Sequence, residues 1–172
     1  GETVSLATRI TGAEPVSVLE VSSIPPLNLE QRLSYLLDYP HGCAEQITSQ
    51  AFPQLALSWL LALSPEQQIT AENNVREVIN RLRSYQTPEG GFAYWPGEPY
   101  ISEWVTSYAV NFLANAQKQG YAVPIQMLQH ATNYMRQVAN SWNRTEPWSQ
   151  QDQAYRLYVL ALAGKPDLAA MN

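Results

Sequence analysis

Apolar side chains recur at helical spacing along most of this chain after residue 27, and Gly and Pro residues interrupt the pattern at intervals. Because an amphipathic helix carries its apolar residues three and four positions apart, this periodicity predicts a series of helices. Each helix has one apolar face to cover, and packing helices in antiparallel pairs covers these faces with short connections. We therefore expect a mainly α fold built of helical hairpins.

Caps and helix breakers place the expected helices. Pro53 has no amide proton and clashes with the preceding turn, so the apolar run 43–63 should be kinked or divided. Residues 64–67 match an N-cap, a first-turn proline and a capping-box glutamine, which predicts a helix that ends near Tyr85. The other helices are expected at 28–38, from Val105 up to Gly120, around 128–138, and from Ala154 up to Gly164.

Two segments depart from the helical pattern. Residues 3–24 alternate loosely and are rich in Val, Ser and Thr, which predicts short strands before Pro25 and Pro26. Residues 86–100 combine Gly and Pro with aromatic side chains, so we expect a long packed loop rather than a flexible linker. The chain is accordingly divided into a β segment, 1–26, and a helical domain, 27–172.

Charge, apolar content and cysteine count exclude several classes of function. The net charge is -5, and the 10 Lys and Arg residues are too thinly spread to neutralise a phosphate backbone, which excludes nucleic acid as a partner. The longest apolar stretch, 55–63, is too short to span a bilayer, and no signal-peptide pattern follows Gly1. A single cysteine excludes an internal disulfide framework and a cysteine-based zinc cluster.

That cysteine stands in a specific local setting. Gly42 precedes Cys43, and Gln46 follows three positions later in an expected first helical turn, so the sulfur and the carboxamide share one face. A thiolate held against an amide carbon at high effective concentration displaces ammonia and leaves a thioester. Such an acyl group is far more reactive than the glutamine, and it would acylate an amine or a hydroxyl through Gln46.

An internal thioester must be kept from water until it is needed, which requires an apolar enclosure. The candidate shielding residues are Tyr39, Trp95, Tyr100 and Trp104. Aromatic residues in a Gly- and Pro-rich loop also pack such loops onto their domains, so both roles stay open. Glu45 is either a first-turn acid that complements the helix dipole or a polar aid to thioester formation.

The segment 39–46, Tyr-Pro-His-Gly-Cys-Ala-Glu-Gln, resembles the thioester signature of α2-macroglobulins and complement components in its bacterial form. The resemblance extends to the lead-in at 27–40, the loop at 86–97 and a later helix at 154–164. It implies an α/α toroid of helical hairpins, of which 27–172 would be the N-terminal part, after a β segment from a flanking β domain. It implies no cofactor and no metal.

The resemblance also implies a function. In this family a protease cuts a bait region elsewhere in the parent protein, and the exposed thioester then captures the protease covalently. The chain is therefore expected to act as an endopeptidase inhibitor with a single-use reactive group, not as an enzyme, with target proteases and neighbouring domains of the parent as partners. Bacterial members are exported, which implies a periplasmic location, with membrane attachment only through an anchor outside this chain.

The resemblance bears on the preferred target atom as well. Complement components that prefer hydroxyl targets use a downstream histidine. This chain has only His41 and His130, and neither lies in the helix expected around 154–162. We therefore expect acylation of amines rather than hydroxyls.

Two other functions remain open. The pattern Gln86-x3-Gly90-x-Phe92 fits the glutamine–aromatic loop of terpenoid cyclases, which are also helical toroids. Such enzymes need clustered aspartates, whereas the chain has three that stand far apart: Asp38, Asp152 and Asp167. The second alternative is a non-reactive helical scaffold, which would keep its binding partners when Cys43 is replaced.

Overall fold

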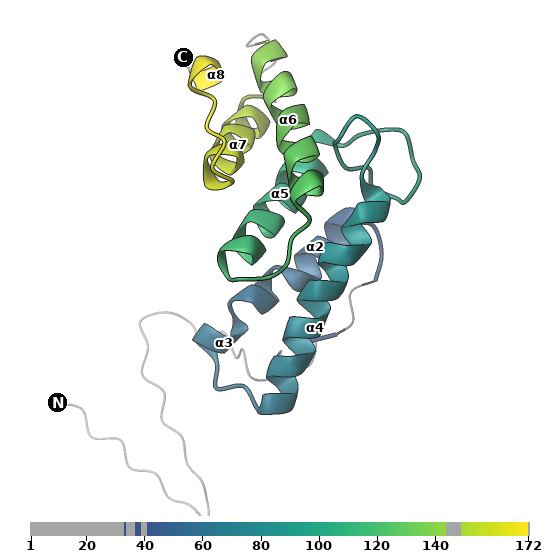
Figure 1. Cartoon of the computed structure of the whole chain (residues 1–172), viewed down its shortest axis with the longest axis vertical. Helices are drawn as coiled ribbons and strands as arrows, with labels where there is room; N and C mark the ends of the chain where they lie inside the picture. Colours follow the sequence, from purple (N-terminus) through teal and green to yellow (C-terminus); the bar gives the residue numbers. More distant parts are fainter. Residues whose placement is uncertain (1–32, 34–36, 39–40, 144–148, 172) are drawn as a thin grey trace, which may run out of the picture.

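The computed structural model describes residues 33, 37–38, 41–143 and 149–171 (Figure 1). The predicted β segment, the candidate shielding residue Tyr39 and most of the helix predicted at 28–38 lie outside these residues. Within that helix, the Leu37 amide donates to the Leu33 carbonyl at 2.9 Å. The two residues are four positions apart, as in the hydrogen bonds of an α-helix.

Helices form nearly all the regular structure of the described residues. The first of them is α2 (Ala44–Ala51), followed by the 3-10 turn η1 (Pro53–Leu55) and the short α3 (Leu57–Leu60). The long α4 (Pro65–Leu82) runs into a second 3-10 turn, η2 (Arg83–Tyr85). The remaining helices are α5 (Glu103–Lys118), α6 (Ile125–Ser141), α7 (Ser149–Leu162) and α8 (Leu168–Met171). The prediction of a mainly α fold is confirmed.

Local signals explain where these helices begin and end. Pro53 divides the apolar run 43–63 into α2, η1 and α3, as its missing amide proton predicts. At the start of α4, the Gln67 amide donates to Ser64 Oγ at 3.2 Å and the Ser64 amide donates to Gln67 Oε1 at 2.9 Å. The predicted capping box is therefore confirmed. The short α8 was not predicted, because four residues carry no periodic pattern.

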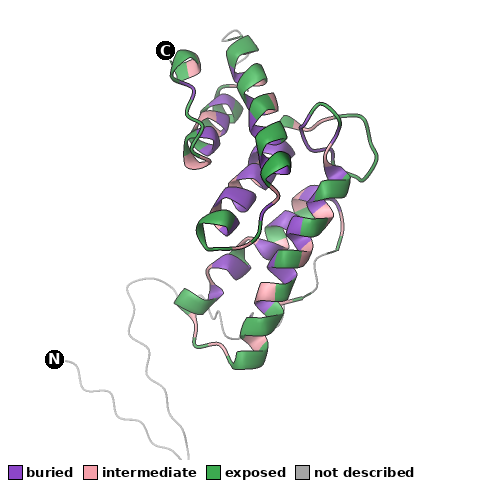
Figure 2. Ribbon diagram, in the orientation of Figure 1, coloured by how far each residue is buried: buried purple, intermediate pink, exposed green. Residues whose placement is uncertain are grey.

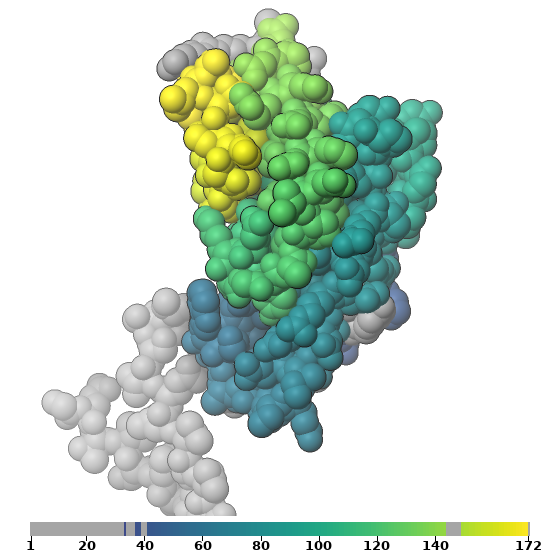
Figure 3. All heavy atoms as spheres, in the orientation of Figure 1, coloured from purple at the N-terminus to yellow at the C-terminus, as the bar shows by residue number. Residues whose placement is uncertain are grey.

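The core lies where the helices face one another, and Figure 2 shows buried residues along these inner faces and exposed residues outside. Helix α2 packs against α4 and α5, and α5 also packs against α6 and α7. In Figure 3 the C-terminal segment lies beside α6, in agreement with the contacts of α6 with α7 and α8. Helix α2 is thus fixed by its packing against α4 and α5.

Among the described helices, none combines the length and the apolarity needed to cross a membrane.

The segment between η2 and α5 is an ordered loop, as predicted. Isolated antiparallel bridges join Gln86 to Phe92 and Ala93 to Ile101. Phe92 is fully buried, and its amide donates to Thr106 Oγ1 at 2.8 Å. Residues 94–100 form the exposed tip of this loop. The loop therefore has a buried base, which is part of the core, and an aromatic tip that faces outward.

Candidate functional site

Cys43 and Gln46 form the first turn of α2. Cys43 is its N-cap residue, in an extended conformation, and it makes a reciprocal capping box with Gln46. The Gln46 backbone amide faces the Cys43 side chain, and the Cys43 amide donates to Gln46 Oε1 at 3.0 Å. Cys43 is 9% exposed, whereas Gln46 is exposed. The fold thus places each of the two side chains against the backbone of the other residue at the helix start, and the thioester bond itself stays a prediction.

Gly42 is required here for two physical reasons. Its φ angle is +117°, a left-handed conformation that residues with a Cβ rarely adopt. A Cβ at this position would also lie 2.9 Å from Gln46 Cδ and would overlap Gln46 Oε1. The missing side chain of Gly42 therefore leaves the space in which the Gln46 carboxamide lies.

Hydrogen bonds from distant elements hold this turn. Buried Tyr85, at the end of η2, donates its phenol hydroxyl to the Gly42 carbonyl at 2.8 Å. The Ala44 amide donates to the Tyr94 carbonyl at 2.9 Å, and the Ala93 amide donates to the Tyr85 carbonyl at the same distance. Sequence reasoning missed Tyr85, because nothing local distinguishes it from any other aromatic residue at a helix end.

The candidate shielding residues are mostly exposed. The exposed fractions are 50% for Trp95, 83% for Tyr100 and 41% for Trp104. The backbone of the loop tip meets the start of α2 through the Tyr94 carbonyl, but Trp95 and Tyr100 remain accessible to solvent. Within these described residues, nothing covers Gln46 completely, so their shielding role stays a prediction.

Trp104 belongs to an aromatic group on α5 and α7. Its ring stacks on Tyr108 with centroids 5.8 Å apart, and it also contacts Tyr155 at 5.3 Å. Ser49, one turn beyond Gln46, donates to the Tyr108 hydroxyl at 3.3 Å. This group therefore lies alongside α2.

Glu45 is half-buried in the first turn of α2, where its charge complements the helix dipole.

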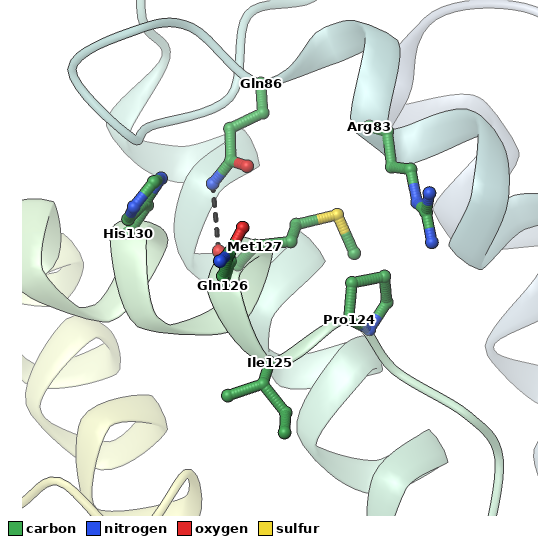
Figure 4. A pocket seen from close by; sticks show the side chains of 7 residues that line it. All are labelled: Arg83, Gln86, Pro124, Ile125, Gln126, Met127 and His130. Atoms are coloured by element: carbon green, nitrogen blue, oxygen red, sulfur yellow. Dashed lines mark hydrogen bonds between the residues drawn. The ribbon is translucent and has the colours of Figure 1, made fainter.

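The glutamine–aromatic loop has a structural explanation. Gln86 Nε2 donates to the Gly90 carbonyl at 2.8 Å and to the Met127 carbonyl at 2.9 Å, which closes the loop and ties it to α6 (Figure 4). A Cβ on Gly90 would lie 2.8 Å from the His130 carbonyl carbon. Both features join the loop to α6, so the Gln86, Gly90 and Phe92 pattern has a structural role in this chain that requires no cyclase chemistry.

An open depression of about 460 Å³ lies beside Gln86. Figure 4 shows the side chains that line it, which come from Arg83, His130 and the start of α6 as well as from Gln86. Neither Cys43 nor Gln46 lines it. Asp167 lies on another part of the domain, where Asn140 and Arg136 donate to its carboxylate. Across the described ranges, no group of three or more His, Cys, Asp or Glu side chains is placed to hold a metal ion.

Comparison with known proteins places this geometry in a family. The profile of the A-macroglobulin TED domain matches residues 17–156. The alpha-2-macroglobulin of Escherichia coli K12 is 30% identical over 100% of this chain and 11% of its own length. The Yersinia pestis alpha-2-macroglobulin homolog is 32% identical over 84% of this chain and 7% of its own length. The chain therefore spans only a small part of these relatives.

Solved structures of alpha-2-macroglobulins also resemble this chain in fold. Native Escherichia coli alpha-2-macroglobulin, from domain MG7 to the C-terminus, matches 86% of this chain and 25% of its own, with 30% identity and a TM-score of 0.68. Salmonella alpha-2-macroglobulin reacted with methylamine matches 86% of this chain and 10% of its own, with 31% identity and a TM-score of 0.71. On the agreement of profile, relatives and fold, the chain belongs to the α2-macroglobulin family, as part of its TED domain.

Proposed function

We propose that Cys43 and Gln46 join into an internal thioester, which the parent protein uses as a covalent protease trap. The observation that carries this proposal is the contact at the start of α2, where the Gln46 carboxamide lies over Gly42 and against the Cys43 amide. In the forming step, Cys43 Sγ bonds to Gln46 Cδ and the C–N bond breaks. The thiol proton leaves with the released ammonia, so the step needs no other reactant.

The trapping step is a second acyl transfer. Once a protease has cut the parent protein, an amine of that protease attacks the Gln46 acyl carbon, an amide forms, and the C–S bond breaks. Cys43 leaves as a thiolate, which takes up the proton that the amine loses. Related structures support this chemistry for those proteins: the Salmonella protein was reacted with methylamine, and the Escherichia coli protein was activated by trypsin and by porcine elastase. Amines are the proposed targets, since His130 lies on α6 rather than on α7.

Protection of the bond requires a neighbouring domain of the parent protein. Gln46 is exposed and so are Trp95, Tyr100 and Trp104, which leaves this face accessible to water. A partner domain pressed against these side chains would exclude water, and Tyr39 would contribute from the lead-in to the turn. Bait cleavage would then remove this cover. The division into a β segment at 1–26 and a toroid part at 27–172 belongs to the same proposal.

The proposed location is the periplasm. A trap of this kind protects the bacterium against proteases that arrive from outside, and it must be exported to meet them. Any membrane anchor would lie in the parent protein outside this chain.

Methylamine treatment of the parent protein tests the thioester. Before treatment, the peptide that contains Cys43 and Gln46 should lack the mass of one ammonia; after treatment, Gln46 should carry a methylamide and Cys43 should become reactive to a thiol reagent. Gln67 is an internal control, because it occupies the same position in the capping box of α4. A thiol that reacts at once, beside an unmodified Gln46 amide, would favour the non-reactive scaffold.

A further inference from the structure

We propose that Tyr85 is a positioning residue for the thioester: it aims the Cys43 amide at Gln46 Oε1, where negative charge develops when the bond forms and when it reacts. This inference rests on the proposed function. It adds a residue 43 positions from Gly42, on a different helical element, to the chemistry of the first turn of α2.

The geometry centres on one peptide group. The Gly42 carbonyl and the Cys43 amide belong to the same planar unit, so their bond directions are fixed relative to each other. The Tyr85 hydroxyl holds the oxygen end at 2.8 Å, and Gln46 Oε1 accepts from the nitrogen end at 3.0 Å. Anchoring the oxygen therefore sets the direction of the N–H bond. A donor on the carbonyl also polarises the group and strengthens its N–H as a donor.

The hydrogen bond from Tyr85 is needed because the residue before Cys43 is a glycine. Gly42 has a φ of +117°, and a glycine has many other accessible backbone conformations. Rotation there would turn the peptide group and move the Cys43 amide away from the carboxamide. Tyr85 opposes this rotation from a fixed position, because the residue is only 3% exposed and its own carbonyl accepts from the Ala93 amide.

The Cys43 N–H would act in two steps, the formation of the thioester and its reaction with an amine. When Cys43 Sγ attacks Gln46 Cδ, the carbonyl π electrons move onto Oε1; the intermediate then collapses and expels ammonia, which carries away the thiol proton. When an amine later attacks the thioester, charge again appears on Oε1 before the thiolate leaves. A fixed N–H directed at that oxygen stabilises both intermediates, as in an oxyanion hole.

The test compares two single-hydroxyl deletions in the parent protein. Tyr85→Phe removes the donor to Gly42 and keeps the ring. The matched control is Tyr155→Phe, because the Tyr155 hydroxyl also makes one contact between elements, accepting from Asn111 Nδ2 at 2.9 Å. The measurements are the fraction of Gln46 that is converted, the rate of methylamine incorporation into the folded protein, and the Tm.

We expect Tyr85→Phe to lower the incorporation rate on the order of tenfold, less than the 10²–10³ cost of deleting an oxyanion donor outright. Tyr155→Phe should react at the wild-type rate, although both variants lose some thermal stability. A Tyr85→Phe protein that has a lower Tm but an unchanged rate would overturn the inference, because its hydroxyl would then serve folding alone.

A second variant covers the case in which Tyr85→Phe does not fold. Gly42→Ala perturbs the same peptide group through the residue that carries its carbonyl, and we expect it to abolish incorporation at Gln46; reaction at the wild-type rate would overturn the inference. Failure of the proposed function looks different. In that case the wild type and Tyr155→Phe would also carry an unmodified Gln46, which removes both proposals together.

Discussion

Helices α2 and α4 both begin with a capping box that ends on a glutamine, and they differ in the N-cap residue and in what surrounds it. In α4, Ser64 and Gln67 exchange hydrogen bonds between side chains and backbone. In α2, the Gln46 amide faces the Cys43 side chain without a cap hydrogen bond, and the Cys43 amide donates to Gln46 Oε1. The amide-to-Oε1 distances are 2.9 Å at Ser64 and 3.0 Å at Cys43. A capping box therefore brings an N-cap atom close to a glutamine carboxamide as a matter of ordinary helix geometry.

The surroundings differ in burial and in anchoring. Ser64 is exposed, and a proline follows it. Cys43 is buried, follows a glycine with positive φ, and belongs to a peptide group that is held by Tyr85. Sulfur is also a better nucleophile than a neutral hydroxyl. The comparison shows that spacing places a glutamine carboxamide beside the N-cap residue in both helices. We attribute the proposed reactivity at α2 to the sulfur nucleophile and to the fixed backbone around it.

The largest expected effect comes from Cys43→Ser, which gives α2 the same cap as α4. Methylamine incorporation at Gln46 should be lost completely, because a neutral hydroxyl does not displace ammonia from an amide. Stability should change by no more than about 0.5 kcal/mol, since serine is a good N-cap residue. Peptide mass spectrometry and thermal unfolding measure the two effects. Persistent labelling of Gln46 would mean that the sulfur is not the leaving group.

The reverse change, Ser64→Cys, asks whether the box alone is sufficient. We expect no methylamide at Gln67, because this turn lacks both the preceding glycine and the Tyr85 hydrogen bond. The helix should lose about 1 kcal/mol of stability through its weaker cap. The same peptide mapping decides the matter. A labelled Gln67 would show that anchoring is unnecessary, and the distinction drawn between α2 and α4 would fail.

A smaller, pH-dependent effect is expected at α8, where the capping group is a carboxylate. The Ala170 amide donates to Asp167 Oδ1 at 3.2 Å. Hydrogen bonds from Asn140, from this amide and from Arg136 lower the pKa of Asp167 below its ordinary value. A lowered folded-state pKa stabilises the fold above the unfolded-state pKa, and this contribution is lost as the pH falls through the folded-state value.

Asp167→Asn tests this prediction. Its free energy of unfolding should depend less on pH than that of the wild type in the acid range, below about pH 4. Urea unfolding at a series of pH values measures the difference. The caps of α2 and α4 carry no carboxylate, so Ser64→Ala should shift stability equally at every pH. Parallel curves for Asp167→Asn and the wild type would contradict the assignment.

Local interactions account for what sequence reasoning predicted correctly. The start of α4 at residue 64 and the break at Pro53 depend on residues within one turn of each other. The end of the α4 segment at Tyr85 follows in the same way from the onset of the Gly- and Pro-rich loop. The contact of Cys43 with Gln46 also lies within a single turn, which is why their spacing was informative.

The amino-acid sequence by itself determined the helices and the placement of Cys43 and Gln46 in the first turn of one helix, because periodicity and capping act over a few residues. Only the tertiary structure decided that Tyr85 anchors the Gly42 carbonyl and that Gln86 ties its loop to Met127, because these contacts join residues 43 and 41 positions apart. It also decided that Trp95 and Tyr100 face solvent. Contacts at such separations depend on how helices pack, and no local pattern records them.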